Sequence, residues 1–502
     1  MDITFYTLFF LIGALGIALG FECINGFHDT ANAVATVIYT KSLKPEVAVL
    51  WSGFCNFLGV LLGGIAVAFS IVHLLPVDLL VKIDTGAGMA MVISLLLAAI
   101  IWNFGTWFMG IPSSSSHTLI GAIIGVGLAN SYLIGHFGSG INWKKAGEVG
   151  MSLLISPLIG FGLAYTLLLI LKRFAPSPAM HEPPHGDTPP PGWIRALLIL
   201  TCTGVSFAHG SNDGQKGIGL IMLILIGLVP MHYAMNMAHG TAEFKQVVEA
   251  TDRIQDTLLD PQMERAMIAY QRSTRPASSR PFESTALAVI QSEDSVIDAP
   301  PQAMLADPDL HTTQELAESV RGQLQGKSSP ADLKPDERWK FRTKALMLDH
   351  SLTKLNSKIM PVLSQEKREM LSQSRSTLRG SFEYAPTWVL VAVAVALGAG
   401  TTVGWKRIVV TVGEKIGKTH LTYSQGASAE LVAMTTIGMA DILGMPVSTT
   451  HVLSSGVAGS MAANKSGLQM STIKSIAIAW ILTLPVSLVL AGGLFLFFRL
   501  FV

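Results

Sequence analysis

The chain has 502 residues; 50% of them are hydrophobic, 14% are charged, and the mean hydropathy is +0.48. Soluble proteins carry about a quarter charged residues, so this composition excludes an ordinary soluble protein and indicates an all-α polytopic membrane protein. The net charge of +1 gives no reason to expect a nucleic-acid partner.

Apolar runs long enough to cross a lipid bilayer recur along the chain. They lie at 4–25, 46–73, 87–109, 147–171, 194–230, 386–404 and 474–500. The first run is preceded by no basic segment and followed by no small-residue cleavage site, so we expect a retained transmembrane helix rather than a signal peptide. The three cysteines lack the spacing of metal ligands, and the sequence predicts no cofactor and no intrinsic metal.

Changes in composition divide the chain into segments. Residues 174–193 are rich in proline and polar residues, which is typical of a linker, and residues 231–385 interrupt the hydropathy pattern with many charges. We therefore expect a first membrane repeat at 1–173, the start of a second repeat at 194–230 and its remainder at 386–502. Residues 231–385 would form an extramembrane insert.

The insert is expected to be partly helical. Residues 244–267 and 342–376 have the pattern of amphipathic helices. Disorder is expected around 298–309 and 326–336, where polar residues and prolines dominate.

Two short polar motifs each occur twice, in the same order, within apolar surroundings. The first motif is Gly26-Phe-His-Asp29-Thr-Ala-Asn-Ala33 and Gly210-Ser-Asn-Asp213-Gly-Gln-Lys-Gly217, and the second is Pro112-Ser-Ser-Ser-Ser-His117 and Pro446-Val-Ser-Thr-Thr-His451. Asp29 and His117 are 88 residues apart, whereas Asp213 and His451 are 238 residues apart, and the difference of 150 nearly equals the length of the charged insert. Without the insert the two halves are in register, which is typical of transporters built from internal repeats.

The positive-inside rule gives an orientation for these halves. Basic residues cluster after the first span, around the linker and after the insert: Lys41, Lys44, Lys172, Arg173, Arg195, Lys406, Arg407, Lys415 and Lys418. Placing them all inside requires an external N-terminus and five crossings per half. An odd number of crossings makes the repeats inverted, and it places the insert outside, which is the periplasm if the source is a Gram-negative bacterium. Lys144 and Lys145 run against this map.

The first copy of the aspartate motif places several polar side chains at helical spacing: Glu22, Asn25, His28, Asp29 and Asn32. Gly20 and Gly26 would permit a break in the helix, and a broken helix exposes carbonyl groups to a cation and amide groups to an anion. A packing patch between helices is the alternative for Asn25. It explains Asp29 poorly, because Asp213 repeats the carboxylate.

The second copy differs at two positions, since Asn212 replaces His28 and Lys216 replaces Asn32. Lys216 follows Asp213 by three residues, within reach of a salt bridge. Its ammonium could replace a coupling cation, attract an anionic substrate, or neutralise Asp213 for folding alone. His28 could carry a proton or be structural.

The hydroxyl runs each follow Gly-X-Pro and precede an apolar helix. Proline ends the incoming helix and Ser or Thr caps the next one, so each run is expected at the tip of a re-entrant hairpin. Hydroxyls and amide groups at two helix N-termini suit a tetrahedral oxyanion. His117 and His451 could fix the hairpins or exchange a proton. Glu430, outside the repeated motifs, is a possible coupling residue.

The four motifs in this order resemble the inorganic phosphate transporter (PiT) family, over both membrane halves and with the pattern of its bacterial low-affinity, proton-coupled branch. The resemblance implies phosphate held between the hairpins, by Ser114, Ser115, Ser116, Thr118, Ser448, Thr449 and Thr450. It implies a coupling-ion site at Asp29, Asn32, Asn212 and Asp213. It also implies carriage of phosphate as a metal–hydrogenphosphate complex, so a divalent metal is a possible co-substrate. His28 and Lys216 depart from the sodium-coupled pattern and favour protons.

We therefore expect a proton-coupled phosphate symporter of the bacterial inner membrane that works by alternating access. The sequence leaves a homodimer possible. A sodium-coupled carrier, or a carrier of another oxyanion such as sulfate or arsenate, is the alternative. An intramembrane hydrolase using Ser116, His117 and Asp29 is the least favoured, because adjacent Ser and His seldom orient as nucleophile and base and no Gly-X-Ser-X-Gly elbow occurs.

Overall fold

The computed structural model describes residues 5–72, 86–135, 137–138, 141, 143–184, 186, 188–261, 263, 310–359 and 364–501. The chain divides into two compact units. The membrane unit consists of Met1–Pro76, Thr85–Ile224 and Ala385–Val502, and the insert unit of Val77–Asp84 and Leu225–Tyr384. The described residues form helices and no strand; Gly417 and Leu468 make an isolated bridge.

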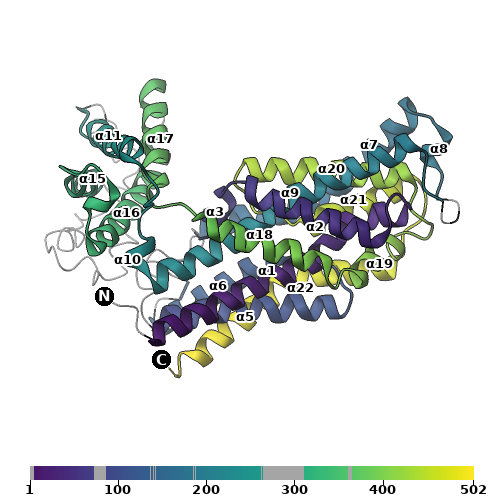
Figure 1. Cartoon of the computed structure of the whole chain (residues 1–502), viewed down its shortest axis with the longest axis horizontal. Coiled ribbons are helices and arrows are strands. Elements are labelled where there is room, and N and C mark those ends of the chain that lie inside the picture. The colour runs from purple at the N-terminus through teal and green to yellow at the C-terminus, as the bar shows by residue number, and fades with distance from the viewer. Residues whose placement is uncertain are drawn as a thin grey trace, which may run out of the picture. The chain divides into compact units, whose positions relative to one another are not determined.

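The membrane unit is a helical bundle whose long helices lie side by side along a common direction, with short helices in some of the connections (Figure 1). In chain order they are α1 (Phe5–Tyr39), α2 (Pro45–Leu62), α3 (Ala66–Val72), α5 (Gly86–Phe108), α6 (Ser115–Leu133), α7 (Trp143–Phe174), α8 (Pro178–His181), α9 (Gly192–Leu228), α18 (Thr387–Thr402), α19 (Lys406–Glu414), α20 (Tyr423–Ile442), α21 (Thr449–Ala463) and α22 (Met470–Phe498). Within the described ranges, six helices are long and apolar enough to cross a membrane, or seven if the bent pair α18–α19 counts as one span. The prediction of a polytopic, all-helical membrane protein is confirmed.

The predicted break in the aspartate motifs is wrong. Helix α1 runs through Asp29 and helix α9 runs through Asp213 without interruption. Gly26 serves packing instead, because a Cβ there would lie 2.4 Å from the carbonyl oxygen of Leu397 in α18. The bent span lies elsewhere: α18 and α19 meet at 64°.

The turns before both hydroxyl runs follow the predicted local chemistry. Gly110 and Gly444 follow the C-terminal ends of α5 and α20 and adopt positive φ angles of 68° and 63°. This conformation favours glycine and ends a helix. The Oγ of Ser114 accepts a hydrogen bond from the amide of His117 at 3.3 Å, and the Oγ of Ser448 accepts one from the amide of His451 at 3.2 Å. The prediction of two serine-capped helices is confirmed.

Helices of the two halves exchange equivalent close contacts. A Cβ at Gly400 in α18 would lie 2.1 Å from the carbonyl oxygen of Cys23 in α1. A Cβ at Gly59 in α2 would lie 2.2 Å from that of Phe207 in α9. Cys23 and Phe207 each stand six residues before the aspartate of their motif. The first helix of each half therefore packs on the second membrane helix of the other half.

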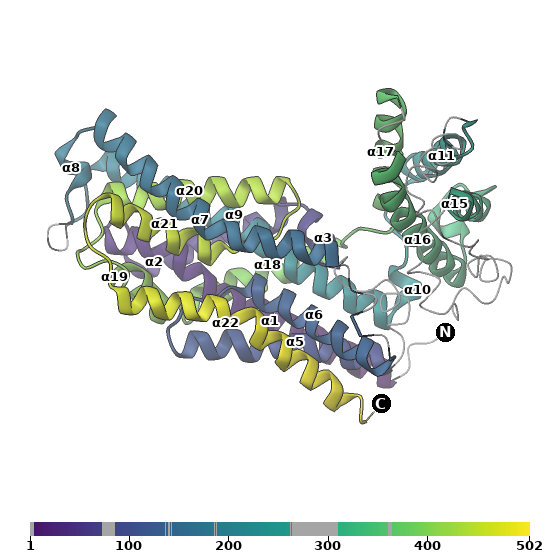
Figure 2. The same cartoon turned by 180° about the vertical axis from the view of Figure 1, so that it is seen from behind.

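The hairpin helices make a second exchange of this kind, and Figure 2 shows α21 beside α7. A Cβ at Gly125 in α6 would lie 2.1 Å from the carbonyl oxygen of Leu488 in α22. A Cβ at Gly459 in α21 would lie 2.2 Å from that of Phe161 in α7. Gly125 and Gly459 each follow the histidine of their hydroxyl run by eight residues. Each hairpin is thus held by the long last helix of the opposite half.

These contacts predict that Gly400→Ala destabilises the membrane unit by about 1–3 kcal/mol, because two backbones must separate to admit the methyl group. The control is Gly16→Ala in α1, where a Cβ would meet no neighbour among the described atoms. Thermal unfolding of both purified variants in detergent measures the difference. Equal melting temperatures would contradict the close approach of α1 and α18.

The insert unit has a core of its own. Its elements are α10 (Pro230–Tyr233), α11 (Thr241–Leu258), α15 (Leu310–Leu324), a 3₁₀ helix at Pro330–Asp332, α16 (Pro335–Ile359) and α17 (Gln365–Gly380). Phe244, Phe341 and Phe382 are fully buried in that core. Burial opposes the charged form of Asp349, but hydrogen bonds and charge from Arg379 and Arg375 outweigh it and hold the pKa of that carboxyl below its ordinary value.

The expected disorder at 326–336 is wrong. Ser329 and Asp332 form a capping box around the 3₁₀ helix, and α16 begins at Pro335. The prolines that suggested disorder occupy first helical positions, where a missing amide hydrogen costs nothing. The other segment with expected disorder, 298–309, lies outside the described residues.

Candidate coupling-ion and anion site

Two helices supply the charged side chains of the candidate site. Helix α1 buries His28 and Asp29, and α9 buries Asp213 and Lys216, each with an exposed fraction of 2% or less. Such residues inside a membrane bundle are costly and mark functional sites. The two sets lie together, because the hydroxyl of Ser115 contacts Asp29 of α1 and both Asp213 and Lys216 of α9.

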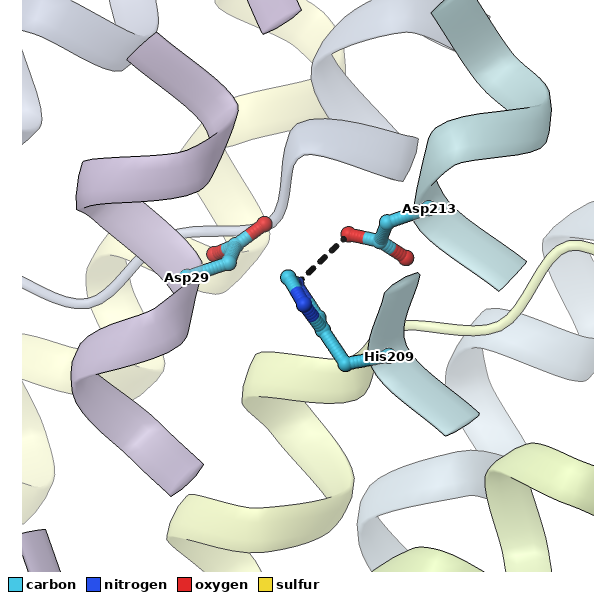
Figure 3. Close-up of side chains that lie close together, drawn as sticks. All are labelled: Asp29, His209 and Asp213. Atoms are coloured by element: carbon cyan, nitrogen blue, oxygen red, sulfur yellow. Dashed lines mark ion pairs between the residues drawn. The ribbon is translucent and has the colours of Figure 1, made fainter. Parts of the chain in front are cut away.

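An ion-pair network surrounds Asp213. The Nζ of Lys216 lies 2.8 Å from Oδ1 of Asp213, so the predicted salt bridge is present. The Nε2 of His209 lies 3.3 Å from the other carboxylate oxygen. Figure 3 shows the imidazole of His209 between the carboxylates of Asp213 and Asp29. Each carboxylate oxygen of Asp213 therefore lies within ion-pair distance of a nitrogen, from Lys216 on one side and from His209 on the other.

Asp29 joins the N-terminal ends of both hairpin helices. Its Oδ2 accepts a hydrogen bond from the hydroxyl of Ser115 in α6 at 2.8 Å, and its Oδ1 accepts one from the hydroxyl of Thr450 in α21 at 2.5 Å. The Nδ1 of His28 lies 3.1 Å from Oδ1. One carboxylate of the first half thus contacts a predicted anion-binding hydroxyl from each half.

Ser115 links the two aspartate motifs. The ammonium of Lys216 donates to its Oγ at 3.1 Å, and Asp213 lies 3.5 Å from the same oxygen. A hydroxyl has a single hydrogen to donate, and the shorter distance assigns it to Asp29. A directed chain of hydrogen bonds therefore runs from Lys216 through Ser115 to Asp29.

The remaining predicted anion ligands lie at the same hairpin tips but face different partners. Ser114 and Ser448 are the helix caps described above. Ser116 donates to the carbonyl oxygen of Val447 at 3.0 Å, which joins the two hairpins, and Thr449 is buried in the first turn of α21. Thr118 donates instead to Oδ1 of Asn103 in α5 at 2.9 Å.

The remaining predicted coupling residues are spread more widely. Asn212 donates to the carbonyl oxygen of Met445 in the second hairpin turn at 3.3 Å. Asn32 belongs to α1, but its side chain lies outside the described residues. Glu430 lies between the hydroxyls of Thr36 and Thr201, both of which donate to it. Thr36 is about two turns of α1 beyond Asp29, so the structure does not bring Glu430 to the aspartate network.

Three contacts were not predicted from the sequence. His209 had a signal, because it precedes Asp213 by four residues and therefore shares its helical face. No sequence signal pointed to the contacts of His28, whose Nε2 lies 3.2 Å from the hydroxyl of Thr106 and 3.4 Å from that of Ser113. These contacts depend on how α5 packs. The two motif histidines meet: the rings of His117 and His451 are 4.6 Å apart between centroids.

The donor atoms of Asp29, His209 and Asp213 all lie within 4.8 Å of one another. Carboxylate and imidazole groups at this spacing would suit a metal cation by type. However, the ammonium of Lys216 already supplies a positive charge at Asp213. We interpret the cluster as an ion-pair network and not as a resident metal site.

A membrane-crossing helical bundle with two buried aspartates and two converging helix N-termini defines a polytopic transport protein. The chain belongs to the phosphate transporter family: the sequence model of that family matches residues 25–491. It is 42% identical to the low-affinity inorganic phosphate transporter PitB of Escherichia coli (strain K12), over 98% of this chain and 97% of the relative. It is 42% identical, with the same coverage, to PitA of the same organism.

A solved structure of a protein described as the sodium-dependent phosphate transporter has the same fold. It aligns with 98% of this chain and 100% of its own, with a TM-score of 0.51 and 19% sequence identity. Membership in a family of transporters sets aside the hydrolase interpretation. The geometry agrees, because Ser116 donates to the carbonyl oxygen of Val447.

Proposed function

We propose that this protein imports inorganic phosphate by symport with protons across the bacterial cytoplasmic membrane. The observation that carries the proposal is the position of Asp29, whose carboxylate accepts hydrogen bonds from Ser115 and Thr450. A group able to bind a proton thereby controls one hydroxyl donor from each anion-binding hairpin. The names of the 42% identical relatives support phosphate as the substrate.

The coupling follows from competition for these hydroxyl hydrogens. While Asp29 is ionised, Ser115 and Thr450 donate to its oxygens and are not available to an anion. A proton on Asp29 weakens both bonds, since a neutral carboxyl is a poorer acceptor than a carboxylate. The hydroxyls can then turn to phosphate beside the N-terminal amides of α6 and α21. Proton and phosphate binding are thus mutually favourable.

Lys216 supplies the fixed positive charge of this scheme. Its ammonium neutralises Asp213 at the place equivalent to Asn32 of the first half, where a coupling cation would otherwise be needed. This supports protons rather than sodium as the driving ion. The asymmetry of the two motifs therefore leaves Asp29 as the carboxylate free to exchange a proton.

The exchange of contacts between halves supports alternating access by inverted repeats. Each hairpin packs on the last helix of the opposite half, so a rocking movement of one half against the other would move both hairpins together. In this scheme the N-terminus and the insert lie in the periplasm. Phosphate would enter as the free ion or as a metal–hydrogenphosphate complex.

The test is uptake of radiolabelled phosphate by the full chain in proteoliposomes. An inward proton gradient is expected to drive accumulation that a protonophore abolishes, whereas a sodium gradient alone is not. Parallel samples with and without Mg²⁺ distinguish the complex from the free ion, and excess sulfate or arsenate tests the choice of oxyanion. Absence of gradient-driven accumulation in every sample would contradict the proposal.

A further inference from the structure

Glu22 is a buried carboxylate that the proposed mechanism does not use. It lies in α1 with an exposed fraction of 0%. Its Oε2 accepts a long hydrogen bond, 3.4 Å, from the side-chain nitrogen Nδ2 of Asn25. Its Oε1 has no hydrogen-bond partner among the described atoms. A buried carboxylate oxygen without a donor is rare and requires an explanation.

The surroundings of Glu22 place it beside the ion-pair network. Its side chain packs on the backbone of Gly217 in α9, where an added Cβ would lie 2.3 Å from its Cγ and 2.7 Å from Oε1. Gly217 directly follows Lys216, and the charged groups that act on Glu22 are Lys216 and Asp213 of α9 and Asp29 of its own helix. Asp29 is about two turns further along the same face of α1.

Glu22 has no equivalent in the second half. The corresponding position, seven residues before Asp213, is Ser206, whose hydroxyl pairs with Ser52 at 2.8 Å. Glu22 is therefore not a second copy of the aspartate site. Nor is it held as Glu430 is, because both oxygens of Glu430 accept hydroxyl hydrogens.

We propose that Glu22 is a second proton-binding site of the transport cycle. In this proposal the carboxyl is neutral in the conformation described, since a fully buried, ionised carboxylate with one unpartnered oxygen costs more free energy than the protonated form. The proton binds Oε1 from water and returns to water when movement of α1 against α9 exposes the Glu22 carboxyl to solvent. Gly217 leaves room for the carboxyl between the two helices.

This inference rests on the proposed proton symport, and the variant Glu22→Gln tests it in proteoliposomes. Gln preserves shape and removes the exchangeable proton. We expect proton-driven accumulation of phosphate to fall by about 100-fold, the lower end of what a positioned proton-transfer group contributes. Exchange of internal for external phosphate needs no net proton movement and should stay close to the wild-type rate. Glu46→Gln, at an exposed site in the first turn of α2, is the matched control.

The outcomes separate the inference from the proposed function. Failure of the wild-type protein to accumulate phosphate with a proton gradient refutes the symport itself. Normal accumulation by Glu22→Gln refutes the role of Glu22, as does equal loss of accumulation and exchange in a variant that elutes as a folded protein. If Glu22→Gln does not fold, Glu22→Asp keeps a proton site in altered surroundings. It should then accumulate phosphate with a shifted pH profile, and an unchanged profile overturns the inference.

Discussion

Asp29→Asn is expected to abolish proton-driven phosphate uptake while the protein still inserts and folds. The carboxylate accepts hydrogen bonds from Ser115 and Thr450 and therefore connects the tips of both hairpins. A positioned proton-transfer group contributes about 10²–10⁴-fold, so we expect the initial rate of uptake to fall by at least about 100-fold. Asn is isosteric, but it cannot exchange a proton and carries a donor where the site needs an acceptor. Asp213→Asn is expected to give the same loss.

Initial rates of phosphate uptake in proteoliposomes measure the effect, with gel filtration of the purified variant as the check on folding. Asp336→Asn makes the same chemical change at an exposed position in the first turn of α16 and should transport normally. Wild-type uptake by Asp29→Asn would remove that residue from the coupling site. It would also disconnect the two hairpins from any proton-controlled step.

Lys216→Asn is expected to change the driving ion. Removing one partner of a buried ion pair costs about 3–5 kcal/mol, because the other charge is left uncompensated. Asp213 would then need a new cation, and the carbonyl oxygen of the introduced Asn, with the carboxylate of Asp213, offers oxygen ligands to sodium. The first half already carries Asn32 at the equivalent position. We expect sodium-stimulated uptake to appear and proton-driven uptake to weaken.

The matched control is Lys216→Met, which removes the same charge and fills a similar volume without an oxygen ligand. It should lose uptake under both gradients. Uptake by each variant is measured with a proton gradient, with a sodium gradient and with both. If Lys216→Asn is still driven by protons alone, the ammonium does not stand in for a coupling cation.

The local features of the site could be predicted from the sequence. Ser114 and Ser448 cap their helices because a Pro two residues earlier ends the preceding segment and a serine oxygen reaches the amide three residues on. The salt bridge of Lys216 with Asp213 follows from a spacing of three residues on a helix. Each of these depends only on neighbours in the chain. The predicted break at Gly26 was wrong because that glycine allows close packing against α18. No local sequence pattern reveals this contact.

The membrane-crossing helices, the duplicated motifs and the helix caps could be predicted from the sequence, because hydropathy and backbone chemistry act over a few residues. Which hydroxyls contact Asp29 depends on tertiary packing instead. Of the candidate hydroxyls, Ser115 and Thr450 donate to Asp29, although Thr450 is 421 residues away in the chain. Thr118 donates to Asn103 instead. That selection depends on the rotation of α6 and α21 about their axes. The rotation is set by close packing against α22 and α7, and no property of the hydroxyl runs themselves encodes it.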